Sequence, residues 1–136
     1  MYKKLIKVAH IDDDESYRFI LKQFLNKISP KTYDIHSFES ANEAFFEINS
    51  NPDYDIIISD YDMPDLNGLE VFNDLRNSGI NIPFILLTGT RHNDVPSKAI
   101  TDGVKFFLHK DTDILSLLKQ LDQLIKVTVR QNNAGQ

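Results

Sequence analysis

The chain has 136 residues, a formal net charge of −5 and no cysteine. This length is typical of one domain that buries about two thirds of its unfolded surface. The acidic balance argues against non-specific binding to nucleic acid or to anionic lipid, and the lack of cysteine excludes disulfides and thiolate metal sites. No apolar run approaches the ~20 residues of a membrane helix. We therefore expect a cytoplasmic protein that binds neither nucleic acid nor a membrane directly.

The pattern of apolar residues predicts strands that alternate with helices along the chain. A strand at 5–11 is followed by a helix at 15–28, whose apolar residues recur on one face, and by a strand at 32–38. The spacing of Ser40 and Glu43 is a capping-box pattern that opens a second helix. The alternation continues with a strand at 55–59, a helix at 66–77, a strand at 84–88, a helix at 94–102, a strand at 105–109 and a helix at 113–126.

Two local signals indicate where the last two predicted helices end. Gly103 follows the helix at 94–102, at the position where glycine commonly ends a helix. The last eight residues, 129–136, are polar, and we expect them to form a frayed tail beyond a single domain of residues 1–128.

Alternation of this kind is typical of an α/β fold, with a parallel sheet covered by helices on both faces. In such sheets, ligands bind at the carboxyl ends of the strands. Asp12 and Asp13 follow the first strand, Asp60 the third, Thr88 the fourth and Lys110 the fifth. These side chains are therefore the candidate site.

Three carboxylates at one sheet edge repel one another, so the cluster is unfavourable unless it is protonated, solvated or neutralised by a cation. An all-oxygen, anionic set of ligands suits Mg²⁺, with Mn²⁺ as an alternative, rather than Zn²⁺. A carboxylate next to such a cation can act as a nucleophile toward phosphorus. Thr88 and Lys110 would then offer a hydroxyl and an ammonium to the phosphoryl oxygens. Pro64 and Gly68 are expected to shape the loop that leaves the site.

Four segments together resemble the receiver domains of two-component response regulators, over about residues 4–126. They are IDDD at 11–14, SDYDMPDLNG at 59–68, LLTGT at 86–90 and FFLHK at 106–110. The resemblance implies the doubly wound, flavodoxin-like order 2-1-3-4-5 for the five-stranded sheet. It also implies a phosphoacceptor module of a phosphorelay rather than an enzyme.

The resemblance assigns roles to the residues around the metal. Asp60 would accept a phosphoryl group from the phosphohistidine of a histidine kinase or of a histidine phosphotransfer protein. Asp13 would bind Mg²⁺ directly, Asp12 largely through water, and Asp62 through its backbone carbonyl.

The resemblance also implies a switch. Thr88 would move toward the phosphoryl group, Lys110 would pair with it, and Phe107 would fill the space that Thr88 vacates. The surface formed by the fourth helix, the fifth strand and the fifth helix would change and present itself to a downstream protein or an attached output domain. The chain would be either a single-domain regulator or the receiver of a longer protein, and phosphorylation would promote a homodimer.

Two residues depart from the family pattern. Asp111 stands where proline usually follows the lysine, and a cis peptide bond before a residue other than proline costs about 2.5–4 kcal/mol. The bond is therefore trans, or the site holds it under strain. Gly89 stands where alanine or serine is common, which would open the phosphoryl group to water. Asp62 and Thr90 flank the same opening.

Several residues also have purely structural interpretations. The side chains of Asp62 and Asp65 suit a solvated turn. Tyr17 and Ile20 lie where the family's first helix meets its kinase, but they also fit the core-facing stripe of that helix. Phe106 and Phe107 must point to opposite faces of the sheet, so one of them is packing alone. The four histidines are scattered, and their spacing is not that of a metal site.

Two other functions would use the same residues. A pseudo-receiver would bind a partner without being phosphorylated, and the Asp111 substitution favours it. A haloacid-dehalogenase-type phosphatase would use Asp60 as nucleophile and Asp62 as general acid. That family carries its paired aspartates on its first strand, however, and this function leaves Asp12 and Asp13 unexplained.

Overall fold

The computed structural model describes residues 4–89, 95–110 and 113–134, and these form one five-stranded parallel sheet in the order β2-β1-β3-β4-β5. The expected fold class and strand order are therefore confirmed. The strands are β1 (Ile6–Ile11), β2 (Tyr33–Phe38), β3 (Ile56–Asp60), β4 (Phe84–Thr88) and β5 (Phe106–His109). The helices are α1 (Glu15–Ile28), α2 (Ala41–Ser50), α3 (Gly68–Asn77), α4 (Val95–Asp102) and α5 (Ile114–Ala134).

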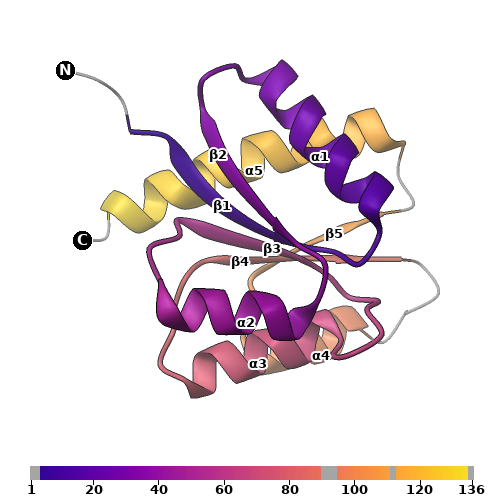
Figure 1. The fold of residues 1–136 in the computed structure, drawn as a ribbon. Coiled ribbons are helices and arrows are strands. Elements are labelled where there is room, and N and C mark those ends of the chain that lie inside the picture. Colours follow the sequence, from indigo (N-terminus) through magenta and orange to yellow (C-terminus); the bar gives the residue numbers. More distant parts are fainter. Residues whose placement is uncertain (1–3, 90–94, 111–112, 135–136) are drawn as a thin grey trace.

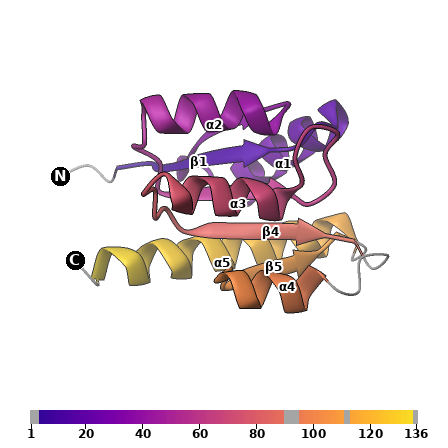
Figure 2. The same ribbon diagram turned by 90° about the horizontal axis from the view of Figure 1, so that it is seen from below.

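Helices cover both faces of the sheet. α1 and α5 lie on one face, and α2, α3 and α4 lie on the other (Figure 1 and Figure 2). Side chains alternate along each strand, so each face has its own apolar cluster. Val8, Ile56 and Ile58 point toward α1 and α5, whereas Ala9 and Ile57 point toward the opposite helices. β3 and β4 are buried at every position, as expected of central strands in a parallel sheet.

The last helix is longer than expected. We predicted its end near Lys126, but α5 continues to Ala134, so a frayed tail is wrong for residues 129–134. Val129 lies one turn beyond Ile125 on the buried side of the helix and joins the same apolar cluster. Packing of this residue extends the helix past the point where the sequence becomes polar. α4 ends before Gly103, which has a positive φ of 104°, as predicted.

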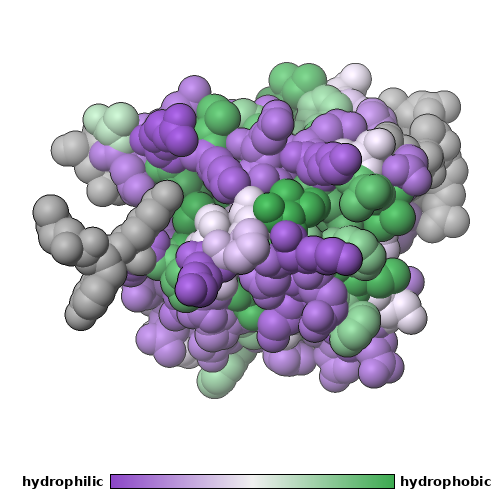
Figure 3. Space-filling model, turned by 90° about the horizontal axis from the view of Figure 1, so that it is seen from above, coloured by the Kyte–Doolittle hydropathy of each residue, from purple (hydrophilic) through white to green (hydrophobic). Residues whose placement is uncertain are grey.

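Viewed onto the side that carries α1 and α5, the surface is mostly hydrophilic, with hydrophobic groups between the polar side chains (Figure 3). No helix among the described residues is both long and apolar enough to cross a membrane.

A buried polar network joins β2, the end of α1 and α5. The Tyr33 hydroxyl donates a hydrogen bond of 2.5 Å to the Asp122 carboxylate, which is buried. Lys126 lies 3.2 Å from the other oxygen of Asp122 and donates a hydrogen bond of 2.7 Å to Ser29, the C-cap of α1. The network therefore ties three elements together at the amino-terminal end of the sheet.

We expect Tyr33→Phe to lower the free energy of unfolding by about 1–3 kcal/mol, because it removes a hydrogen-bond donor from a buried carboxylate. Urea unfolding followed by circular dichroism measures this change. Tyr17→Phe is the matched control, because the Tyr17 hydroxyl is buried without a hydrogen-bond partner and its loss should not destabilise the protein. Equal effects of the two substitutions would contradict the assigned role of the Tyr33–Asp122 bond.

Candidate functional site

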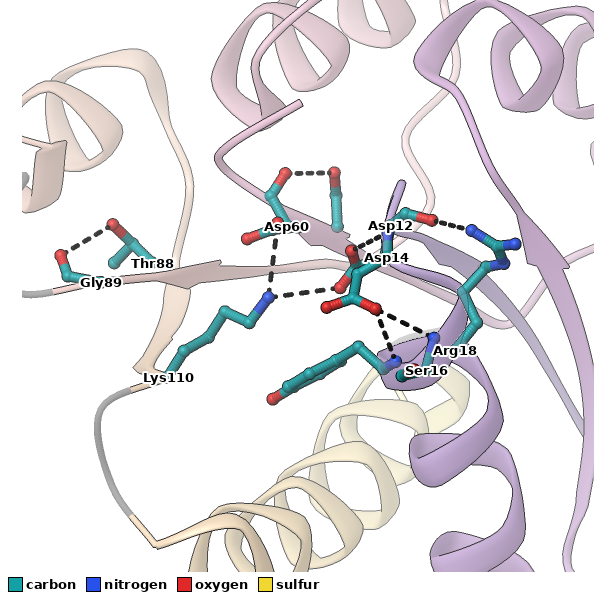
Figure 4. A network of polar contacts seen from close by, with 10 residues as sticks. Asp12, Asp14, Ser16, Arg18, Asp60, Thr88, Gly89 and Lys110 are labelled. Atoms are coloured by element: carbon teal, nitrogen blue, oxygen red, sulfur yellow. Dashed lines mark hydrogen bonds and ion pairs between the residues drawn. The ribbon is translucent and has the colours of Figure 1, made fainter. Parts of the chain in front are cut away.

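Three of the predicted residues, Asp12, Asp60 and Lys110, meet at the carboxyl end of the sheet (Figure 4). Lys110 Nζ lies 3.3 Å from Asp12 Oδ2 and 3.4 Å from Asp60 Oδ2. Asp12 directly follows β1, Asp60 ends β3, and Lys110 directly follows β5. β1 and β3 are direct neighbours in the sheet, which is why residues 48 positions apart in the sequence share one site.

Asp12, Asp13 and Asp60 form an acidic cluster. Each contributes one carboxylate oxygen, and these three oxygens lie within 4.8 Å of one another. Asp12 and Asp60 are buried, whereas Asp13 is exposed. The cluster thus opens to solvent on the Asp13 side.

The pKa values of the two buried carboxyl groups are raised mainly by their burial. Burial raises the pKa of Asp60 to about 6, and the Asp12 charge adds to the rise while Lys110 opposes it. Burial also raises the pKa of Asp12, although the Asp14 backbone N–H and Lys110 both favour its ionised form. Burial, more than repulsion between the carboxylates, therefore opposes the ionisation of these two groups.

The residues fit a hard divalent cation. The donors are carboxylate oxygens, two of them are held at low accessibility, and they carry more negative charge than their protein partner neutralises. Mg²⁺ binds through one or two carboxylates and keeps other positions for water and phosphoryl oxygens. When bound here, such an ion would shield the charge of incoming phosphoryl oxygens.

Two further aspartates of the motifs have structural roles. The Asp14 side chain caps α1 by accepting hydrogen bonds from the backbone N–H groups of Ser16 and Tyr17, at 2.9 and 3.2 Å. The Asp65 carboxylate accepts a hydrogen bond of 3.0 Å from the Asn42 N–H in the first turn of α2. Asp65 thereby joins the loop after β3 to α2 and is more than a solvated turn residue.

Thr88 lies at the same edge but its hydroxyl is directed away from Asp60 (Figure 4). It ends β4, is buried, and donates a hydrogen bond of 3.4 Å to the carbonyl of Gly89. The structure thus places Thr88 beside the carboxylates without joining it to them. Thr90 and Asp111, which we singled out in the sequence, lie outside the described residues, as does the Lys110–Asp111 peptide bond.

The structure gives a reason for glycine at position 68 that the sequence did not supply. It begins α3 directly behind the site, and a Cβ atom there would lie 2.5 Å from the Asp60 carbonyl oxygen and 2.6 Å from Leu86 Cδ1. Its N–H also donates to the Tyr61 carbonyl at 3.0 Å. Asn67 and Glu70 form a reciprocal capping box that fixes the start of this helix. Gly68 therefore lets α3 approach the backbone of Asp60.

The two phenylalanines of β5 face opposite ways, as predicted. Phe106 packs on the cluster beneath α1 and α5, and Phe107 packs on the opposite cluster. Phe107 is half-buried, with its ring edge-on to His109 at a centroid distance of 6.2 Å.

The sequence analysis did not connect two residues, Tyr17 and His10, to the charge of Lys110. Tyr17 and Ile20 pack on the core, which favours their structural interpretation, but the Tyr17 ring also contacts Lys110, with Nζ 3.9 Å from the ring centroid.

His10 is fully buried on β1, and neither ring nitrogen has a hydrogen-bond partner. Burial, followed by the charges of Lys110 and Arg18, lowers the pKa of His10 to about 3, so its ring is neutral. The sequence signal that could have revealed the burial of His10 is its position on a buried strand, two residues before Asp12.

Comparisons with known proteins agree with this geometry. The family model for the response regulator receiver domain matches residues 8–122. Response regulator MprA of Mycolicibacterium vanbaalenii is 28% identical over 131 residues, which cover 96% of this chain and 55% of that protein. Chemotaxis protein CheY1 of Helicobacter pylori is 28% identical over 107 residues, which cover 77% of this chain and 85% of that protein.

Solved structures show the same fold. A response regulator receiver domain protein from Clostridium thermocellum superposes with a TM-score of 0.81 at 22% identity, over 97% of this chain and 100% of the other. The chain therefore belongs to the response regulator receiver domain family of two-component systems. It spans 55% of the length of MprA and 10% of a further relative, the sensor protein EvgS of Escherichia coli.

Proposed function

We propose that this receiver accepts a phosphoryl group on Asp60 from the phosphohistidine of a histidine kinase or a histidine phosphotransfer protein. The observation that carries the proposal is the position of the Asp60 carboxylate, 3.4 Å from the Lys110 ammonium and within the cluster formed with Asp12 and Asp13. A nucleophilic oxygen, a cationic group for the phosphoryl oxygens and a set of metal ligands thus occupy one edge of the sheet.

In the transfer, an Asp60 oxygen attacks phosphorus and forms an acyl phosphate as the phosphorus–nitrogen bond of phosphohistidine breaks. The electron pair of that bond stays on the imidazole nitrogen. Asp60 must be ionised to attack, and Lys110 favours its ionised form. The same ammonium then pairs with an oxygen of the transferred group. The chain carries out on itself both this transfer and the later hydrolysis, in which water takes the phosphoryl group as inorganic phosphate and the Asp60 carboxylate is restored. It therefore acts as a phosphoacceptor rather than as an enzyme on other substrates.

Mg²⁺, or Mn²⁺ in its place, is the cation that we propose for the acidic cluster. Asp13 and Asp60 would bind it directly, Asp12 largely through water, and Asp62 through its backbone carbonyl. This assignment is supported by the exposure of Asp13, which leaves its carboxylate accessible from solvent, and by the hydrogen bonds that hold Asp12 in place.

Phosphorylation would then act as a switch. The Thr88 hydroxyl, now bonded to the Gly89 carbonyl, would turn toward the phosphoryl group, and Phe107 would move into the vacated space. The surface of α4, β5 and α5 would change as a result, and the phosphoryl group would favour one of two packings. The half-buried state of Phe107 supports this role, because a fully packed ring would have no space to move.

The implied partners are a kinase or phosphotransfer protein on one side and a downstream protein or attached output domain on the other. We place this exchange in the cytoplasm, either in a single-domain regulator or within a longer protein, with a homodimer promoted by phosphorylation. Neither direct binding to nucleic acid nor binding to a membrane is part of the proposal.

The test is the intact mass of the protein after incubation with acetyl phosphate, with and without Mg²⁺, beside Asp60→Asn. We expect one phosphoryl adduct that requires Mg²⁺ and is absent from the variant. Its decay rate measures how far Gly89 exposes the group to water. Absence of any adduct, with Mg²⁺ binding shown separately, would favour a pseudo-receiver.

A further inference from the structure

Two carboxylates and one aromatic ring lie close to the ammonium group of Lys110. Besides the carboxylates of Asp12 and Asp60, the Tyr17 ring lies beneath it, with Nζ 3.9 Å from the ring centroid. A cation over the face of a tyrosine ring is attracted by the negative charge of that face. The distance is well within the ~6 Å over which this attraction acts.

The tyrosine ring, rather than its hydroxyl, makes this contact. The hydroxyl is buried and has no hydrogen-bond partner, and burial together with the Asp12 and Asp60 charges raises its pKa, so it stays protonated. Among the described residues, the hydroxyl therefore makes no hydrogen bond with Lys110. The aromatic face is thus the part of Tyr17 that can act on the site.

The position of the ring is fixed by its own surroundings. Tyr17 lies in the first turn of α1, where its N–H donates to the capping Asp14 carboxylate at 3.2 Å. Its side chain packs on the apolar cluster beneath α1 and α5, and its ring lies 6.4 Å from the buried His10 ring. By contrast, Lys110 reaches the carboxylates through a flexible four-carbon chain that loses conformational entropy when it is held.

We propose that Tyr17 is a positioning residue for phosphoryl transfer: its ring holds the Lys110 ammonium against the Asp60 carboxylate, where the incoming phosphoryl oxygens require a donor. This proposal rests on the proposed function. The ammonium has three N–H donors, and the two carboxylates and the ring face all lie close enough to receive them.

Three replacements at one position separate the ring face from packing. Tyr17→Phe keeps the ring and its negative face. Pentafluorophenylalanine at position 17 keeps the shape but reverses the charge of the face. Tyr17→Leu keeps apolar bulk alone. The initial rate of Mg²⁺-dependent adduct formation with acetyl phosphate should stay within about twofold of wild type for Tyr17→Phe. For the other two variants it should fall about tenfold, which corresponds to about 1.4 kcal/mol in the barrier.

A second readout needs neither metal nor activity. In the metal-free protein, the ε-CH₂ protons of Lys110 should show an upfield ring-current shift in carbon–proton correlation spectra of the wild type and of Tyr17→Phe. The shift should be lost in Tyr17→Leu. Thermal unfolding of each variant shows that the fold is retained, and the pentafluorophenylalanine variant serves if leucine impairs folding.

The outcomes separate this proposal from the proposed function. A wild-type protein without any adduct overturns the proposed function and, with it, the role of Tyr17 in transfer, whatever the spectra show. If the wild type is phosphorylated, equal rates for the phenylalanine and pentafluorophenylalanine variants overturn the positioning role. Absence of the Lys110 upfield shift in the wild type would overturn it as well, since the ring contact would then be missing in solution.

Discussion

Replacing Gly68 by alanine should destabilise the protein by about 1–3 kcal/mol and slow phosphorylation of Asp60, because the new methyl group has no space. Its Cβ would lie 2.5 Å from the carbonyl oxygen of Asp60 and 2.6 Å from Leu86 Cδ1. The leucine can change its rotamer, but the carbonyl belongs to the backbone of β3. Either the start of α3 or the end of β3 must therefore move, and Asp60, the proposed nucleophile, moves with the strand.

Urea unfolding and the rate of adduct formation with acetyl phosphate measure the two effects. Gly79→Ala is the matched control. No atom outside its neighbours lies within 4 Å of a Cβ there, but its φ of 82° makes alanine unfavourable. This control should lose about 1 kcal/mol through the backbone and leave the phosphorylation rate unchanged. A Gly68→Ala protein with the stability and rate of wild type would show that α3 does not depend on the close approach.

Replacing His10 by valine should make stability less sensitive to acid. In the unfolded chain the histidine pKa is about 6.5, whereas in the folded protein burial and the Lys110 charge lower it to about 3. Between these values the unfolded chain binds a proton that the folded protein does not, so the His10 contribution to stability is lost as pH falls from about 6.5 toward 3. At about 1.4 kcal/mol per pH unit, the loss by pH 5 is about 2 kcal/mol.

The titration of Asp60 changes stability with pH in the opposite direction. Its folded pKa of about 6 lies above the unfolded value of 3.8, so its contribution is complete below 3.8 and is lost as pH rises through 6. The measurement is therefore a difference: urea unfolding of wild type and His10→Val at pH 7.5 and pH 5, with Asp60 present in both. The variant should lose about 2 kcal/mol less over this interval. His109→Gln, at an exposed position, is the control and should follow wild type. Parallel stability curves for wild type and His10→Val would contradict a buried, neutral His10.

Local patterns were enough to locate most elements of this fold. The period of apolar residues predicted α1 at residues 15–28 and β4 at 84–88 with the bounds that the structure has. It also predicted that Phe106 and Phe107 face opposite sides, because side chains alternate strictly along a strand. The predicted end of α5 was wrong because Val129 is held by contacts with distant residues, and local polarity does not report such contacts.

The candidate site likewise has features that the sequence predicted and features that only the structure shows. By itself, the sequence determined which side chains end the strands, since Asp12, Asp60, Thr88 and Lys110 each follow or close an apolar run, and their chemistry followed from their types. Only the tertiary structure decided how close they lie, because the order of β1, β3, β4 and β5 depends on pairing between segments far apart in the chain. It also decided that His10 is neutral, that Gly68 borders Asp60, and that the Tyr17 ring contacts Lys110. The last two properties arise from proximity in three dimensions and have no signature in residue spacing, whereas the position of His10 on a buried strand, two residues before Asp12, is a signal of its burial.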